Sequence, residues 1–143
     1  MTAPLSHRNL SSARARFAYA ETVHWPDRWR PEATARVQGL PIQMRTQGLL
    51  VTLAMLTGGG DDGQKAFKGV DDTLARTLTT WLLVEAPHRP LGRAGAKAQP
   101  FPADLLDILT KAPRADYAAA QREAILLLDQ IKIFAKALPR TRT

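Results

Sequence analysis

Long segments rich in alanine and leucine, separated by prolines and glycines, are the feature that most constrains how this chain can fold. Within these segments the apolar residues recur three or four positions apart, which is the spacing of one face of an α-helix. The sequence shows no series of short segments in which apolar and polar residues alternate, as strands would require. We therefore predict an all-α fold in which residues 1–143 form a single domain. About five or six helices are expected to pack around a buried central helix.

Prolines, glycines and capping residues mark where the predicted helices begin and end. The first helix is expected to follow Ser11 or Ser12, and Pro26 and Pro31 then interrupt the pattern, because two prolines this close do not fit inside one regular helix. Asp71 or Asp72 is expected to cap a later helix. The other helices are predicted at residues 32–37, 41–56, 103–111 and 116–137. Residues 1–10 and 139–143 are expected to be flexible termini, and residues 87–102 an exposed loop.

The segment 41–56 is predicted to be the buried central helix. Pro41 suits the first turn of a helix, where its missing N–H costs nothing, and the residues after Gly48 are apolar on nearly every side, as in a buried helix. The opening turns contain Gln43 and Arg45. Free backbone N–H groups and Arg45 would together form a phosphate site there. The alternative is that Arg45 pairs with a carboxylate of another helix.

The net charge of +7 is unevenly distributed along the chain. Residues 1–50 hold seven arginines against three acidic residues, whereas residues 51–86 hold three basic against five acidic residues. This distribution favours one surface that faces a polyanion, although a basic chain can also simply be more soluble. On the last predicted helix Lys132 and Lys136 are four residues apart and repel each other. An external anion would relieve that repulsion; the alternative is that they suit the helix C-terminal dipole.

Several function classes are disfavoured by what the sequence lacks. The absence of cysteine excludes disulfides, thiolate zinc sites and a cysteine nucleophile, and it suits the cytoplasm. Gly58 and Gly63 have the spacing of a phosphate-binding loop, but Gln64 precedes the lysine and Ala66 replaces the required hydroxyl. The longest apolar run, residues 49–56, is far shorter than the roughly 20 residues that cross a membrane. We expect a cytoplasmic protein that is not an enzyme, with no metal, cofactor, small-molecule substrate or membrane contact.

Two blocks of the sequence resemble a known family. Residues 39–56 contain Leu-Pro, then a Gly-Leu pair that leads into a helix rich in leucine and alanine. Residues 117–138, with Glu123-Ala124, resemble the closing helix of the same family, the small all-helical subunit of the type III-B CRISPR (Cmr) effector complex. The resemblance implies that several copies stack along the complex beside other subunits. They would contact guide RNA and target RNA through basic residues while other subunits cut.

We predict that mainly basic residues bind RNA. The two arginines of the first helix are included because the family resemblance implies an RNA contact there. The candidate RNA-binding residues are Gln43, Arg45, Arg122, Lys132, Lys136, Arg140, Arg14 and Arg16. One alternative is a protein–protein scaffold whose basic faces meet acidic subunits. Another is a helical DNA-binding regulator, which would need a recognition helix with several base-reading side chains.

Overall fold

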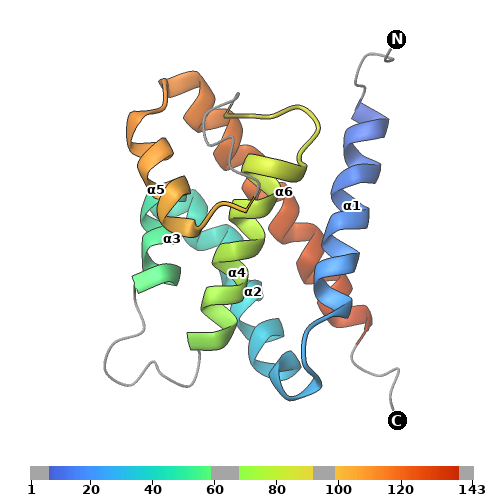
Figure 1. Ribbon diagram of the computed structural model, residues 1–143. Helices are drawn as coiled ribbons and strands as arrows, with labels where there is room; N and C mark the ends of the chain where they lie inside the picture. The colour runs from blue at the N-terminus through green and yellow to red at the C-terminus, as the bar shows by residue number, and fades with distance from the viewer. Residues whose placement is uncertain (1–6, 59–67, 92–98, 139–143) are drawn as a thin grey trace.

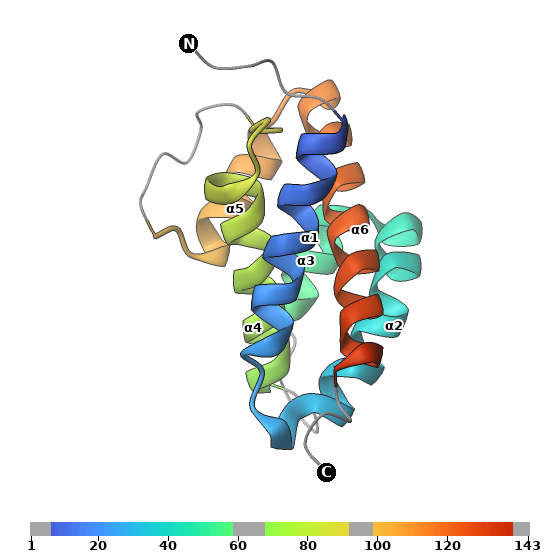
Figure 2. The ribbon, with the colours of Figure 1, turned by 90° about the vertical axis from the view of Figure 1, so that its right-hand side faces the viewer.

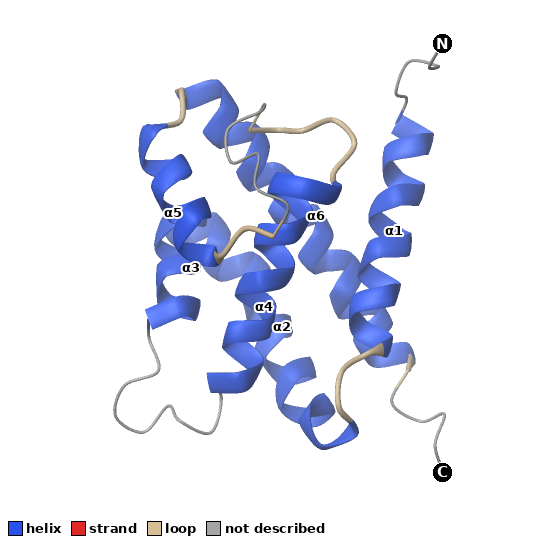
Figure 3. Ribbon diagram, in the orientation of Figure 1, coloured by secondary structure: helices blue, strands red, loops and turns tan. Residues whose placement is uncertain are grey.

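The computed structural model describes residues 7–58, 68–91 and 99–138, and every regular element within these ranges is a helix (Figures 1 and 3). The α-helices are α1 (His7–Val23), α2 (Arg30–Gln47), α3 (Leu49–Gly58), α4 (Lys68–Thr80), α5 (Pro102–Lys111) and α6 (Arg114–Ala137). A 3-10 turn, η1 (Asp27–Trp29), precedes α2, and a π-helical turn, η3 (Trp81–Glu85), continues α4. The predicted all-α fold is confirmed.

The longest helix, α6, lies between α1 and α2 and packs along both of them (Figure 2). Helix α3 packs against α2, α4 and α5, so these shorter helices complete the bundle. The core holds apolar residues from every α-helix. Its fully buried large side chains are Trp81, Leu40, Met44, Leu49, Leu53, Leu56, Leu74, Leu78, Leu82, Leu105, Leu127 and Leu128.

The prediction of two separate helices, at residues 32–37 and 41–56, is wrong. Helix α2 runs without interruption from Arg30 through Gly39 and Pro41 to Gln47. Pro41 lacks the N–H that would complete the helical hydrogen bond, but its ring and the neighbouring Leu40 are buried. Packing along the whole buried face of α2 therefore outweighs the local cost of the proline.

The break falls instead at Gly48. Its backbone angles, φ 93° and ψ 161°, lie in a region that is essentially restricted to glycine. Helix α3 begins at the next residue, so the segment expected as one buried helix is divided between two. Helix α3 is buried on one side only: Leu53 and Leu56 are in the core, whereas Val51 and Met55 are 46% and 43% exposed.

Helices α1, α4 and α6 begin several residues earlier than expected. Helix α1 begins at His7, before the serines that were expected to cap it, and α6 begins at Arg114. Helix α4 begins at Lys68, so Asp71 lies in its first turn. The Asp71 carboxylate is buried, and its Oδ1 accepts a hydrogen bond from Arg36 Nε at 2.8 Å. Asp71, which was one of the two residues expected to cap this helix, therefore forms an ion pair that joins α4 to α2.

The loop predicted over residues 87–102 is not exposed throughout its described part, and its last residue is helical. Pro90 and Leu91 are buried, and Pro102 already belongs to α5. The prediction of a flexible N-terminus over residues 1–10 is wrong for residues 7–10, which belong to α1. Residues 1–6 and the expected flexible end at 139–143 lie outside the described residues, as do residues 92–98. None of the helices in the described ranges has the length and apolar character needed to span a membrane.

The first prediction concerns the glycine that separates α2 from α3. We expect Gly48→Ala to lower the free energy of unfolding by about 1–3 kcal/mol, because alanine strongly disfavours this backbone conformation and its Cβ would lie 3.1 Å from Tyr117 Oη. Gly39→Ala is the matched control, since a Cβ there meets no atom within 4 Å. In a helix interior that change is expected to stabilise by roughly 0.5–1 kcal/mol. Chemical denaturation measures the free energy of unfolding of both variants. Equal effects of the two substitutions would contradict the explanation that Gly48 is needed where α2 ends and α3 begins.

Candidate nucleic-acid interface

Two of the candidate arginines meet at one groove on the surface between α2 and α6. Arg45 comes from the last turn of α2, and Arg122 from the exposed side of α6. The groove holds about 350 Å³ and is also lined by Ala118, Gln121, Ile125 and Leu126 of α6. The structure thus brings together two cationic side chains that lie far apart in the sequence. We call this the Arg45–Arg122 groove.

Arg45 also makes the ion pair that was the alternative to a phosphate site. Its Nη2 lies 3.8 Å from Asp129 Oδ2 of α6, and the two side chains are 56% and 38% exposed. A long, solvent-exposed pair of this kind contributes little to stability, because water and salt screen it. The Arg45 guanidinium is therefore held near α6 but is still accessible to an external anion.

The two lysines of the last helix extend the positive charge along α6. Lys132 is half-buried, and Lys136 is exposed. Arg122 and Lys136 are separated by about 21 Å along the helix axis, from a rise of 1.5 Å per residue. We define the α2–α6 basic face as Arg45, Arg122, Lys132 and Lys136.

Gln43 does not belong to this face, and the predicted helix N-terminal phosphate site is wrong. Because α2 starts at Arg30, Gln43 lies near its C-terminal end, where backbone N–H groups are already bonded within the helix. The Gln43 side chain donates from Nε2 to Gln47 Oε1 at 3.2 Å and contacts Met55 Sδ at the same distance. It therefore links α2 to α3.

The true N-terminus after Gly48 is capped by side chains of α6. The backbone N–H of Leu49 donates to Gln121 Oε1 at 2.8 Å, and that of Leu50 donates to Tyr117 Oη at 2.9 Å. These N–H groups are consequently unavailable to a phosphate. Sequence reasoning missed both contacts, because no local pattern relates Tyr117 and Gln121 to residues so far away along the chain.

Arg14 is a structural residue rather than an RNA contact. It is buried, and its Nε and Nη2 donate to Glu123 Oε2 and Oε1 at 2.6 and 2.8 Å. Glu123 is only 3% exposed, and its Oε2 also accepts from Trp81 Nε1 at 2.8 Å. This bidentate pairing satisfies both charges, and the 9% exposure of the Arg14 side chain leaves little of the guanidinium accessible to a phosphate.

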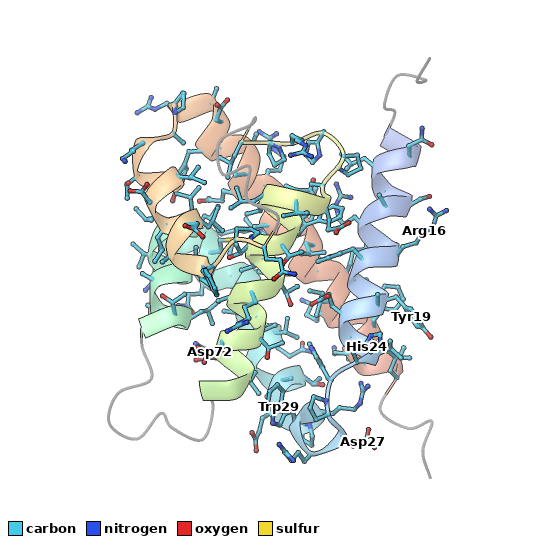
Figure 4. The ribbon with its side chains drawn as sticks, in the orientation of Figure 1. Arg16, Tyr19, His24, Asp27, Trp29 and Asp72 are labelled. Carbon is cyan, nitrogen blue, oxygen red and sulfur yellow. The ribbon has the colours of Figure 1, made fainter. Side chains whose placement is uncertain are left out.

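Of the remaining two candidates, Arg16 does not join the basic face. Arg16 is exposed on α1, and its side chain points away from the bundle (Figure 4). Arg140 lies outside the described residues. Among the described residues, the candidates that form the face come from α2 and α6.

His88 completes the buried cluster around Glu123. Its Nε2 lies 3.4 Å from Glu123 Oε1. Burial lowers the pKa of His88 below its usual 6.5; the Glu123 carboxylate opposes this shift and the Arg14 guanidinium adds to it. A neutral His88 is therefore the form that the folded protein favours.

In the described part of the chain, no three histidine or acidic side chains are grouped so as to hold a metal ion.

Comparison with known families now identifies the class of protein. The model of the CRISPR-associated protein family Cas_Cmr5 matches residues 10–138. This chain belongs to that family. It is therefore a small subunit of the type III-B CRISPR (Cmr) complex, as the two sequence blocks implied. No curated protein matches the chain. In this Cmr subunit the family match includes the whole α2–α6 basic face and the cluster around Glu123.

The second prediction tests the buried ion pair of the Cmr subunit. Glu123→Gln leaves Arg14 buried without a counter-charge, so we expect the free energy of unfolding to fall by about 3–5 kcal/mol. Asp107→Asn is the control, because its pair with Lys111 is exposed and should change stability by less than about 1 kcal/mol. Denaturant titration of both variants measures the difference. A decrease no larger for Glu123→Gln than for the control would show that the cluster does not hold the helices together.

The third prediction concerns how the free energy of unfolding depends on pH. Because the folded pKa of His88 lies below its unfolded value, its contribution to stability is fully present above pH 6.5 and is lost as the pH falls through the folded pKa. We expect His88→Gln to make stability less dependent on pH below 6.5. His24→Gln is the control, since His24 is exposed. Unfolding free energies measured across this pH range test the expectation, and parallel curves for the parent and His88→Gln would refute it.

Proposed function

We propose that this Cmr subunit is a non-catalytic RNA-binding component that contacts the backbones of guide RNA and target RNA through the α2–α6 basic face. Several copies would stack along the complex in the cytoplasm and serve antiviral defence. The observation that carries the proposal is the convergence of Arg45 and Arg122 on one groove. Arginine binds phosphate through a planar fork of donors, which suits backbone recognition without base sequence.

The charge balance of the face supports a polyanionic partner. Asp129 is the one acidic residue that pairs with a member of the face in the described part of the chain, and that pair is long. Like charges four residues apart on α6, Lys132 and Lys136, are relieved when an anion binds. A strand that tracks α6 would meet Arg122 and the two lysines in turn.

The non-catalytic role is supported by how the carboxylates are used. Glu123 and Asp71 are buried in pairs with Arg14 and Arg36. The exposed Asp107 pairs with Lys111 on the same helix. Carboxylates that are already paired with cations of the same chain are poorly placed to exchange a proton with a substrate.

A protein–protein scaffold without RNA contact is the second candidate, and a specific observation favours it. Ile42, Leu126 and Ile133 are 67%, 39% and 58% exposed on the same two helices that carry the basic face. Exposed apolar side chains beside arginines are a common composition for protein interfaces. The two candidates differ in what salt and charge reversal do to RNA binding.

The fourth prediction distinguishes the RNA-binding role from the scaffold without RNA contact. Lys132→Glu with Lys136→Glu, and separately Arg122→Glu, should weaken binding of the reconstituted complex to target RNA by a similar factor for different RNA sequences. The log–log salt dependence should become shallower by about 0.7 for each phosphate of a single strand that a variant no longer neutralises. Binding across a salt series, measured with the parent and each variant, gives both quantities.

Arg76→Glu is the matched control, because Arg76 is exposed on α4, away from the basic face. It should leave the affinity and salt dependence of the complex unchanged. Apart from the half-buried Lys132, the substituted side chains are exposed, and exposed substitutions typically alter stability by no more than about 0.5 kcal/mol. Melting temperatures therefore show whether each variant is folded. Variants of the basic face that bind RNA like the parent, with the same salt dependence, would favour the scaffold.

A further inference from the structure

The Arg45–Arg122 groove has a composition that phosphate binding alone does not require. Its lining has two cationic side chains, one amide and three apolar side chains, Ala118, Ile125 and Leu126. Sugar-phosphate backbone needs cations and hydrogen-bond donors, whereas an apolar surface between them offers nothing to a phosphate. The volume of about 350 Å³ falls within the roughly 300–1,000 Å³ typical of pockets for small organic groups.

The apolar part of the groove is partly solvent-exposed and firmly supported. Leu126 is 39% exposed, whereas the neighbouring Ile125 is 9% exposed and anchored in the core. Gln121 is fixed because its Oε1 accepts the hydrogen bond from the Leu49 N–H that caps α3. A flat apolar group placed in the groove would cover Leu126 without disturbing the helices.

The two arginines give the groove its charge preference. No acidic residue lines it, and the pair between Arg45 and Asp129 is long and exposed. In the described part of the chain, no carboxylate forms an ion pair with Arg122. The groove therefore combines an apolar floor with two cations, which suits a ligand that is flat and apolar in its middle and anionic at its ends.

We propose that the groove seats one unpaired nucleotide of the bound RNA. The base lies on Ala118, Ile125 and Leu126, and the phosphates on either side of it pair with Arg45 and Arg122. A guanidinium plane can also stack on a base. A base inside a duplex is stacked between its neighbours and cannot enter, so the contact selects an unstacked nucleotide of any sequence. This inference rests on the proposed RNA-binding function and adds the base as a second ligand group.

The test compares RNA with and without bases on the full chain. The probes are an oligouridine decamer and a decamer of the same ribose-phosphate backbone that lacks bases, each at low salt. Stacking of a base on an aromatic side chain contributes roughly 1–3 kcal/mol in single-strand binding sites. The groove is aliphatic, so we take the low end of this range, which corresponds to about 5-fold in affinity. We expect the decamer without bases to bind at least about 5-fold more weakly than oligouridine.

Leu126→Asn separates the base contact from the phosphate contact. It removes the exposed apolar floor but keeps both arginines, so the preference for oligouridine should disappear while binding of the decamer without bases is unchanged. Ile133→Asn is the matched control, because Ile133 is also exposed on α6 but does not line the groove; it should keep the preference. Arg122→Gln should weaken binding of both decamers.

The results with the two decamers distinguish a failure of the nucleotide site from a failure of the proposed RNA-binding function. Equal binding of the two decamers by the parent, with both weakened by Arg122→Gln, would overturn the nucleotide site and leave the proposed RNA-binding function intact. Binding of neither decamer, or binding that Arg122→Gln does not change, would contradict both. Displacement of oligouridine by an aspartate decapeptide as effectively as by unlabelled oligouridine would show that the groove is a site for an acidic protein segment, and would also overturn the inference.

Discussion

The arrangement of the helices depends on one buried carboxylate. Glu123 of α6 accepts hydrogen bonds from Arg14 of α1 and from Trp81 of the π-helical turn, and His88 lies beside it. A buried carboxylate is tolerated only when its charge and hydrogen bonds are satisfied, so these elements must meet at one place. Helix α1 follows α6 as a result, which leaves the opposite side of α6 to pack on α2. The surface that carries the basic face is thereby set by an interaction on the far side of the same helix.

A second constraint fixes the other edge of that surface. Gly48 turns the chain so that α3 can start at once, and Gln121 and Tyr117 of α6 accept hydrogen bonds from the N–H groups that this start exposes. Helix α6 therefore provides polar anchors on two sides, to α1 through Glu123 and to α3 through Gln121. Gln121 also lines the Arg45–Arg122 groove. The groove is thus built on a residue that is already immobilised by the fold, which favours a preformed binding site.

The all-α class and the last helix could be predicted well from the sequence, because α6 carries a long apolar stripe at regular spacing. Prediction failed at Pro41 and Gly48, where local rules and tertiary packing compete: a proline usually marks a helix start, but burial of Leu40 and the proline ring keeps α2 continuous. Because of that error Arg45 and Gln43 were expected at the start of a helix, whereas they lie near the C-terminal end of α2. The burial of Arg14 was equally hidden, since no local pattern reveals that its partner is Glu123 in the last helix. Charge pattern alone identified Arg122, Lys132 and Lys136 as candidates, but not the groove that Arg122 shares with Arg45.

Whether RNA lies along α2 and α6 of the Cmr subunit decides between the RNA-binding role and the scaffold. Photo-crosslinking of target RNA to the assembled effector complex, followed by mass-spectrometric mapping of the crosslinked peptides, tests this placement most directly. We predict crosslinks in the last turn of α2 and on α6 between Arg122 and Lys136. Crosslinks confined to α4 or α5, or found only on other subunits of a complex that retains this one, would contradict it.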